Sequence, residues 1–328
     1  TKTVAATEAM KIPAFLNCKI KAHATTVLYD NLVLKNTSGV LIVKDQKVTL
    51  DNVKTAIFGG QIGFNGSVST KEKTPKFDMK MNLNQVDIYQ TFTQLDMLKK
   101  IAPIAGIING KLNSTMTLSG NLKDTEMTPN LNTLTGDILG QLLSTTVNPT
   151  SSTLLNSLDN KLNFIDLKKV NLNDLKTAVS FQNGKVTIKP FDIKYQDITV
   201  NVGGTHGFDQ SMNYNLKFDV PAKYLGNDAN ALLSKLSPSD ISKLSVPVNA
   251  NVTGSFSAPK VATDVKQATT LLISNLAKEQ KNKLINKGSS ALEELINKNT
   301  KNGDTTKTKG AVNQAKDLLN GLFKKKKP

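Results

Sequence analysis

The chain has 328 residues, of which 38% are hydrophobic, 21% charged and 5% aromatic, and its formal net charge is +16. This length allows one large domain or two, with a mainly aliphatic core because Trp is absent. Every basic residue is Lys, and the lack of Arg disfavours the bidentate contacts that read nucleic-acid bases. Between Lys260 and Pro328, 15 Lys and 6 Asp or Glu contribute +9 of the charge, so the preceding body is only mildly basic. We therefore expect no nucleic-acid partner.

The single cysteine, Cys18, rules out an intrachain disulfide. No apolar run reaches the roughly 18 residues that a membrane-spanning helix needs, and residues 1–11 lack the pattern of a signal peptide. Because the sequence does not begin with Met, we expect it to be a fragment, with its targeting signal in a missing N-terminal segment.

Alternation of apolar and polar residues dominates the first part of the chain, which is typical of strands with one apolar face. Short strands and a turn are expected first, at residues 15–22, 26–29, 32–34 and 36–39. The apolar positions that follow are Leu41, Val43, Val48, Leu50, Ile62, Phe64, Phe77, Met79, Met81 and Leu83. Phe58-Gly59-Gly60 interrupts them, and we expect its glycines to form a kink or bulge that lets the sheet curl.

The period changes at residues 89–101, where apolar side chains recur every three positions. This predicts an amphipathic helix that ends near Pro103 and plugs or gates one end of the sheet. Strand alternation resumes after Gly110 with Leu112, Met116 and Leu118.

Two more helices are predicted in the middle of the chain, at residues 131–147 and 151–164. The first follows Thr128-Pro129, a helix-start signal, and Asn148-Pro149 separates the two. We expect both helices to lie across one end or one mouth of the sheet.

A second strand block, residues 175–220, repeats features of the first block in the same order. The run Lys185 to Ile188 matches the run Lys47 to Leu50, 138 residues earlier. Gly203-Gly204 is matched to Gly59-Gly60. The alternating set Tyr214, Leu216, Phe218 and Val220 is matched to the set Phe77, Met79, Met81 and Leu83. These three matches predict a duplicated sheet unit.

The C-terminal part is predicted to be mostly helical. Two short helices are expected within residues 223–244, and a last strand within residues 246–256. After Pro259 the chain is expected to be helical and basic, with a polar linker at residues 300–310 and an amphipathic helix at residues 312–323. The expected division of the chain is a first β unit with a capping helix, a helical insertion, a second β unit and a basic amphipathic tail, at residues 1–125, 126–174, 175–260 and 261–328.

Residues that would support catalysis or metal binding are sparse. His23 and His206 have no neighbouring Cys or paired acids, and each is expected to be a surface residue of a strand. Residues 203–207 are glycine-rich but no helix or Gly-Lys-Ser/Thr follows, so they do not form a phosphate loop. The acids that lie between apolar strand residues are expected in turns or on the solvent face; they are Asp192, Asp197 and Asp209. We predict a non-enzymatic protein without metal or cofactor.

Several short runs resemble the C-terminal region of the AsmA family, which includes TamB-like proteins. The runs are residues 32–42, 48–50, 57–62, 107–112, 118–120 and 252–261. The similarity covers roughly residues 12–261 and rests on the order and spacing of the runs. The resemblance implies a periplasmic protein anchored in the inner membrane by an N-terminal segment absent from this chain. It also implies a role in outer-membrane biogenesis and in phospholipid transport, with a long curled sheet whose inner face is an apolar groove.

The strands by themselves allow either a two-layer sandwich with a dry core or a trough that holds acyl chains, because burial of apolar area favours both. With the resemblance, we predict a mainly β fold with amphipathic helices: a curled antiparallel sheet of two related units that forms an apolar groove, then a helical basic tail. The expected function is non-enzymatic lipid binding, in which the groove holds or passes phospholipid acyl chains to support outer-membrane assembly and maintenance.

The predicted groove residues lie on the strict alternations: Ile62, Phe64, Phe77, Met79, Met81, Leu83, Leu112, Met116, Leu118, Val186, Ile188, Tyr214, Leu216, Phe218 and Val220. The C-terminal lysines are predicted to contact a membrane surface: Lys324, Lys325, Lys326 and Lys327. Two alternatives stay open. One is a scaffold with a dry core that binds outer-membrane assembly proteins through sheet edges, and the other is an adhesin built of β repeats.

Overall fold

The structure is a computed structural model that describes residues 10–29, 31–148, 152–234, 236, 238–242 and 244–300. The chain forms two compact units. The sheet unit comprises Thr1–Tyr224 and Ser245–Ala268, and the helical unit comprises Leu225–Leu244 and Thr269–Pro328. The lysines Lys324–Lys327 and the helix predicted at residues 312–323 lie outside the described residues.

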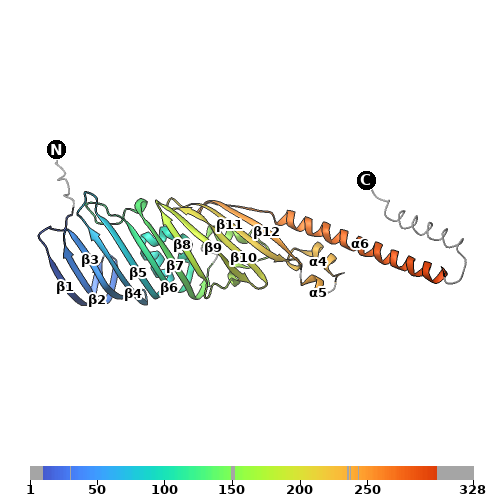
Figure 1. Ribbon diagram of the computed structural model, residues 1–328, viewed down its shortest axis with the longest axis horizontal. Helices are drawn as coiled ribbons and strands as arrows, with labels where there is room; N and C mark the ends of the chain where they lie inside the picture. Colours follow the sequence, from blue (N-terminus) through green and yellow to red (C-terminus); the bar gives the residue numbers. More distant parts are fainter. Residues whose placement is uncertain are drawn as a thin grey trace. The chain divides into compact units, whose positions relative to one another are not determined.

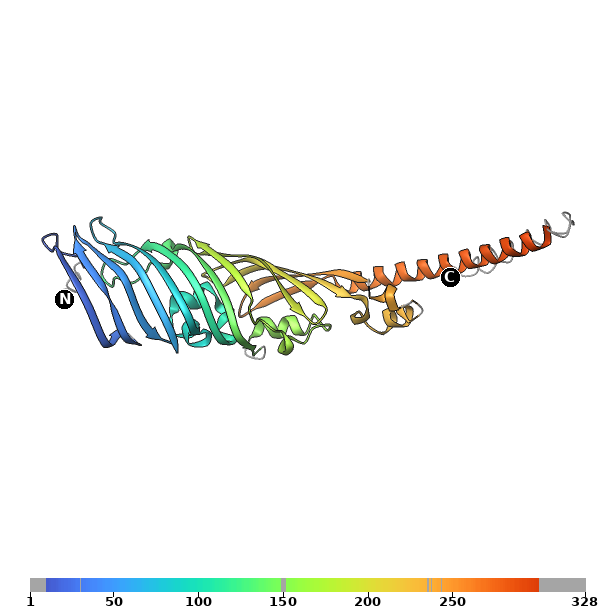
Figure 2. The ribbon, with the colours of Figure 1, turned by 60° about the horizontal axis from the view of Figure 1, so that its bottom comes forward.

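The sheet unit is a single antiparallel sheet of 13 strands, in which each strand pairs with its neighbours in the sequence. The sheet is curled and unclosed, so β1 and β13 are its two edges (Figures 1 and 2). This confirms the predicted fold class. The strands are β1 (Cys18–Tyr29), β2 (Leu32–Lys44), β3 (Lys47–Ile57), β4 (Gly60–Ser69), β5 (Lys76–Asp87), β6 (Ile108–Asn121), β7 (Thr135–Val147), β8 (Lys176–Gln182), β9 (Lys185–Tyr195), β10 (Ile198–Gly207), β11 (Ser211–Pro221), β12 (Ser245–Ser255) and β13 (Pro259–Thr263).

Connections between the antiparallel strands alternate between two rims of the sheet. The first rim carries the β2–β3, β4–β5, β6–β7, β8–β9, β10–β11 and β12–β13 connections, and the second rim carries the other six connections. Among the described residues of the sheet unit, the helices follow connections on the second rim, apart from one turn of 3₁₀ helix on the first rim, η2 (Leu131–Thr133). They are α1 (Ile88–Gln94), α2 (Asp96–Ile101), η1 (Pro103–Ile107), α3 (Thr153–Asp159), η4 (Leu167–Lys169) and η5 (Ala222–Tyr224).

The helical unit is described separately. It contains α4 (Asn227–Leu233), α5 (Pro238–Ile241) and most of α6 (Val265–Thr300), whose first turn belongs to the sheet unit. These elements agree with the two short helices predicted within residues 223–244 and with the helical segment predicted near the C-terminus.

Strand register shows that one face of the sheet is apolar along its whole width. Residues that pair across neighbouring strands share a face. One such row, which we call the central inner row, crosses all 13 strands from β1 to β13: Ile20, Leu41, Leu50, Gly66, Met79, Leu118, Gly136, Phe181, Val186, His206, Met212, Gly254 and Pro259. It contains no Lys, Asp or Glu. The adjacent row on the outer face contains Lys19, Asp78 and Lys185.

The predicted repeat is visible in the strand lengths. Strands β3 and β4 begin at residues 47 and 60, and β9 and β10 begin 138 residues later with the same lengths. The strand positions also change the predicted glycine match. Gly204 lies 138 residues after Gly66 and occupies in β10 the position that Gly66 occupies in β4, so these two glycines are equivalent.

The glycines at 59 and 60 do not bend the sheet as predicted. Phe58 and Gly59 have φ of 53° and 64° and form the tight turn between β3 and β4. Gly203 does lie at a shift of register between β9 and β10. A bulge is therefore present in the second repeat but not at the position predicted in the first.

The helix predicted at residues 131–147 is wrong: Leu131–Thr133 form the 3₁₀ turn η2, and Thr135–Val147 form β7. Ile138 and Leu142 lie four residues apart, a spacing that suits one face of a helix and also one face of a strand. In the structure β6 and β8 pair with both edges of β7, so the sheet satisfies its backbone groups. Strand β13 was also missed, because residues after Pro259 were predicted to be helical.

The other predicted helices are shorter than expected. The helix predicted at residues 89–101 is broken at Leu95, whose backbone is extended between α1 and α2. The helix predicted at residues 151–164 is reduced to α3, which Ser152 caps by accepting a hydrogen bond from the backbone N–H of Leu155.

Candidate functional site

All fifteen predicted groove residues lie on the inner face of the sheet, as the pairing of their strands shows. Their exposure divides them into two groups. Nine are buried by the protein itself: Ile62, Phe77, Leu83, Leu112, Met116, Leu118, Val186, Phe218 and Val220. Six are only half-buried: Phe64, Met79, Met81, Ile188, Tyr214 and Leu216. The inner face is thus covered in some places and accessible in others.

Residues 88–107 cover the middle of the inner face, and we call this segment the helical plug. The side chains of Ile88, Phe92, Leu98 and Ile101 are at most 8% exposed and belong to one apolar cluster with residues of β5, β6 and β7. The Asp87 carboxylate caps α1 by accepting a hydrogen bond from the backbone N–H of Gln90 at 2.8 Å. The segment was predicted to plug or gate one end of the sheet, but it lies over the middle.

A second helical segment, α3 and the residues after it, covers the inner face farther along the sheet. Leu154, Leu158 and Leu162 are buried, and α3 contacts β13. The ring of Phe164 packs edge-on against Phe218, with ring centres 5.5 Å apart. Phe218 is 3% exposed, so at this position the inner face forms a closed core.

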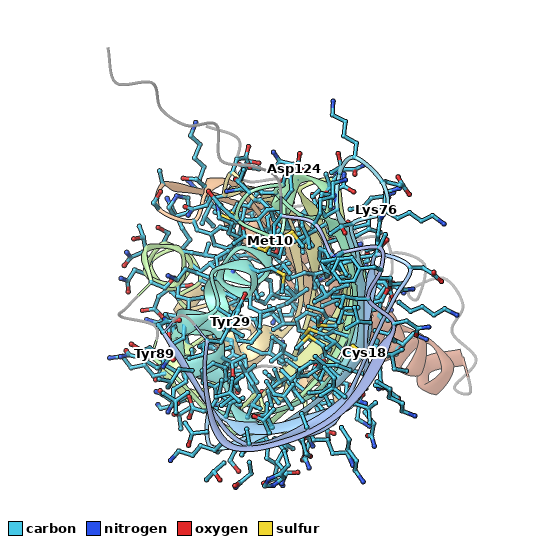
Figure 3. All side chains as sticks on the ribbon, turned by 90° about the vertical axis from the view of Figure 1, so that its left-hand side faces the viewer. Met10, Cys18, Tyr29, Lys76, Tyr89 and Asp124 are labelled. Carbon is cyan, nitrogen blue, oxygen red and sulfur yellow. The ribbon has the colours of Figure 1, made fainter. Side chains whose placement is uncertain are left out.

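The inner face over β1–β5 includes a wide accessible stretch, which we call the open trough, although Ile62, Phe77 and Leu83 on these strands are buried. Ile188, Tyr214 and Leu216 on β9 and β11 form a smaller half-buried patch. The exposure of the open trough increases toward the edge strand: Met79 is half-buried, while Ile20 is 48% and Tyr29 64% exposed. Figure 3 looks along the sheet from the β1 end and shows β1 and β2 as a curved wall, with side chains and helical turns inside it. The open trough is lined by Ile20, Tyr29, Leu41, Val43, Val48, Leu50, Phe64, Val68, Met79 and Met81.

Most of these lining residues were not among the predicted groove residues. Leu41, Val43, Val48 and Leu50 were recognised as an alternating apolar set, but they were not assigned to the groove. The alternation of apolar and polar residues in this stretch could have assigned these four residues to the groove as well. Ile20 and Tyr29 were harder to select, because only the position of β1 at the edge exposes them.

The segment before β1 lies along the first rim next to the open trough. The backbone N–H of Ile12 donates to Thr70 Oγ1 at 2.9 Å, and the backbone N–H of Met10 donates to the carbonyl oxygen of Asp124 at 3.0 Å. Thr70 is fully buried under this contact. The segment therefore connects the β4–β5 loop with the β6–β7 loop.

His206 is buried on the inner face, not on the strand surface as predicted, because β10 directs it toward the plug. It is 3% exposed. Its Nε2 lies 3.3 Å from the carbonyl oxygen of Lys100 in α2, and because a carbonyl only accepts, Nε2 carries the proton. Nδ1 then accepts from the Tyr214 hydroxyl at 2.7 Å. Burial lowers the pKa of His206 and raises that of Tyr214.

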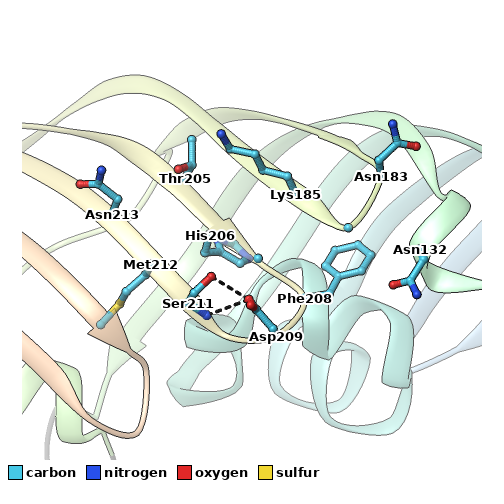
Figure 4. Close-up of a pocket in the computed structure, with 12 residues that line it drawn as sticks. Asn132, Asn183, Lys185, Thr205, His206, Phe208, Asp209, Ser211, Met212 and Asn213 are labelled. Carbon is cyan, nitrogen blue, oxygen red and sulfur yellow. Dashed lines mark hydrogen bonds between the residues drawn. The ribbon is translucent and has the colours of Figure 1, made fainter.

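A shallow pocket of about 470 Å³ lies beside the β10–β11 turn, lined by His206, Phe208 and mainly polar side chains (Figure 4). Its single acid, Asp209, accepts hydrogen bonds from the hydroxyl and the backbone N–H of Ser211. Asp192, Asp197 and Asp209 are all exposed, as predicted. Across the described residues no three His, Cys, Asp or Glu side chains are grouped in a way that could hold a metal ion. The pocket thus lacks a paired acid and base.

None of the helices in the described ranges has an apolar stretch sufficient to cross a membrane. Comparison of the chain with protein-family models, curated proteins and solved structures finds no match.

Proposed function

We propose that this protein is a non-enzymatic, lipid-binding module whose open trough holds the acyl chains of a phospholipid. In line with the AsmA resemblance of its sequence, we place it in the periplasm, where it would support assembly and maintenance of the outer membrane from an anchor in the inner membrane. In this function no side chain takes part in a chemical step. The trough supplies an apolar surface and nothing more.

The observation that carries the proposal is an apolar face left accessible on one part of the sheet. Ile20, Leu41, Leu50, Gly66 and Met79 are consecutive members of the central inner row and remain half-buried or exposed. Exposed apolar surface of this kind is costly in water, and large patches mark binding sites. An acyl chain is a suitable occupant because it needs no hydrogen-bond partners, and this row offers none from charged side chains.

The helical plug limits how the trough would be used. It fills the inner face over β6, where Leu112, Met116 and Leu118 are at most 5% exposed. An acyl chain would therefore occupy β1–β5 and end at the plug. In this arrangement the protein holds a lipid, and passage along the sheet would require the plug to move.

The test compares two neighbouring positions on β2. Leu41 pairs with Ile20 on the inner face, whereas Ile42 pairs with Lys19 on the outer face, and both side chains are half-buried. Native mass spectrometry after incubation with phospholipid vesicles should show bound lipid for the wild type and for Ile42→Asp, and little for Leu41→Asp. Circular dichroism would confirm that both variants are folded. Equal lipid uptake by the two variants, or none by the wild type, would overturn the proposal.

A second candidate function, a scaffold for outer-membrane assembly proteins, is favoured by the free edge of β1. This strand has 12 residues, and within the described part of the chain its only strand partner is β2, so its other edge offers backbone groups to a strand of a partner. Hydrogen exchange distinguishes the two functions. Strand addition would slow exchange of the β1 amides when the partner is added, while lipid alone would leave the edge amides exchanging as before.

A further inference from the structure

The first rim of the open trough is strongly basic. Six exposed lysines lie on it between the segment before β1 and the start of β5: Lys11, Lys44, Lys47, Lys71, Lys73 and Lys76. We call them the lysine rim. Among the described residues, the turns of this rim between β2 and β5 contain two acids, Asp45 and Glu72, and Glu72 forms an ion pair with Lys76 at 2.6 Å. The rim therefore has a clear excess of positive charge beside an uncharged apolar face.

Two of these lysines are placed where they repel each other. Lys44 and Lys47 are directly opposite across the β2–β3 pair, and Ser69 separates Lys47 from Lys76 in the next two strands. This row is one position beyond the inner residues Val43, Val48 and Phe77, so it lies on the outer face at the very end of the strands, where a lysine side chain can extend over the rim. Like charges opposite each other destabilise a sheet. In the described part of the chain no ion pair compensates Lys44 or Lys47. An anion bound between them would relieve this repulsion.

The second rim of the same strands has a different character. The β3–β4 turn is Phe58-Gly59, with Phe58 buried, and Lys111 is opposite Asp87 across the β5–β6 pair. The positive charge is therefore concentrated on one side of the trough. An amphiphile with an anionic head and apolar tails would be bound in one orientation.

We propose that the lysine rim binds the phosphate group of an anionic phospholipid whose acyl chains lie in the open trough and point toward the helical plug. This inference rests on the proposed function and adds to it the class of lipid and its direction. The ten residues of β4 span about 33 Å from rim to rim, whereas the acyl region of one bilayer leaflet is about 15 Å deep. A chain that starts at the lysine rim thus fits within the width of the trough.

The experiment measures uptake from vesicles of phosphatidylglycerol and, separately, of phosphatidylcholine, by native mass spectrometry at low salt. The rim variant carries Lys44→Gln, Lys47→Gln and Lys76→Gln. The matched control carries Lys54→Gln, Lys80→Gln and Lys217→Gln, which remove the same charge from other exposed strand positions. We expect the wild type and the control to prefer phosphatidylglycerol, and the rim variant to lose about tenfold or more of that preference while it still takes up phosphatidylcholine.

Other outcomes separate the possible failures. If the wild type takes up neither lipid, the proposed function itself is wrong. If it takes up both equally, or if the control loses the preference as much as the rim variant, the lipid function stands but the headgroup assignment is wrong. A last arm uses inorganic phosphate in place of vesicles. Phosphate binding that only the rim variant loses, with an unchanged lipid preference, would make the rim a site for free phosphate and overturn the headgroup assignment.

Discussion

His206 Nε2 lies 3.3 Å from the carbonyl oxygen of Lys100, a residue 106 positions earlier in the sequence. This hydrogen bond joins β10 to the C-terminal turn of α2. The helical plug follows β5 of the first strand block, but this hydrogen bond holds it to β10 of the second strand block. The phenol of Tyr214, on the neighbouring strand β11, holds the imidazole from its other side.

Stability should therefore depend on pH through His206. Burial lowers its folded-state pKa below the value of about 6.5 that an unfolded histidine has, so the unfolded state binds more protons when the pH falls through this range. Stability is greatest above about pH 6.5 and decreases on acidification. Urea unfolding at about pH 7.5 and about pH 5.5 should show this loss in the wild type and in His23→Gln, and a flatter profile in His206→Gln. A profile that His206→Gln leaves unchanged would contradict the role of this histidine.

The covered and the open parts of the inner face should respond differently to truncation. Phe218→Ala removes a buried ring that packs against Phe164 and should cost about 3–5 kcal/mol of unfolding free energy. Phe64→Ala truncates a half-buried ring of the open trough and should cost about 1–2 kcal/mol. Denaturant unfolding of the two variants measures both. Similar losses would show that the trough is as closed as the core.

Gly66 should be less tolerant of a side chain than Gly63, three residues earlier on the same strand. A Cβ at Gly66 would collide with the carbonyl oxygen of Asp78, and a Cβ at Gly63 would find its nearest neighbour at 3.9 Å. Gly66→Ala should lower the free energy of unfolding by about 1–3 kcal/mol, while Gly63→Ala should change it by less than about 1 kcal/mol. The equivalent variant Gly204→Ala should resemble Gly66→Ala, since its Cβ would collide with the same part of the neighbouring strand.

The single cysteine offers a direct report on trough occupancy. Cys18 is exposed and pairs with Val43 on the inner face of β1. A polarity-sensitive fluorophore attached there should shift to the blue when phosphatidylglycerol vesicles are added, because bound acyl chains exclude water from the probe. The control places the probe on the outer face of the same strand, with His23→Cys in a Cys18→Ala background. If both positions shift alike, the lipid does not occupy the trough.

The alternation of apolar and polar residues predicted strands correctly where one face of the strand is exposed to solvent and the other is apolar. The alternation in β5 and β11 predicted both strands, and the burial along them follows the same period of two. The pattern was ambiguous in β7, where Ile138 and Leu142 suit either period while Leu139 is apolar yet 59% exposed on the outer face. Pairing with β6 and β8 makes this segment a strand, and the residues of β7 alone do not show which strands it pairs with.

By itself, the sequence predicted that the protein is mainly β, that its strands share one apolar face, and that a sheet unit is duplicated, of which β3–β4 and β9–β10 match in spacing and length. These properties are local, because the pleat places alternate residues on opposite faces wherever a strand forms. Only the tertiary structure decided which part of that face is covered. The helical plug packs over β6, and α3 contacts β13. These long-range contacts leave the open trough over β1–β5 as the largest accessible part of the inner face.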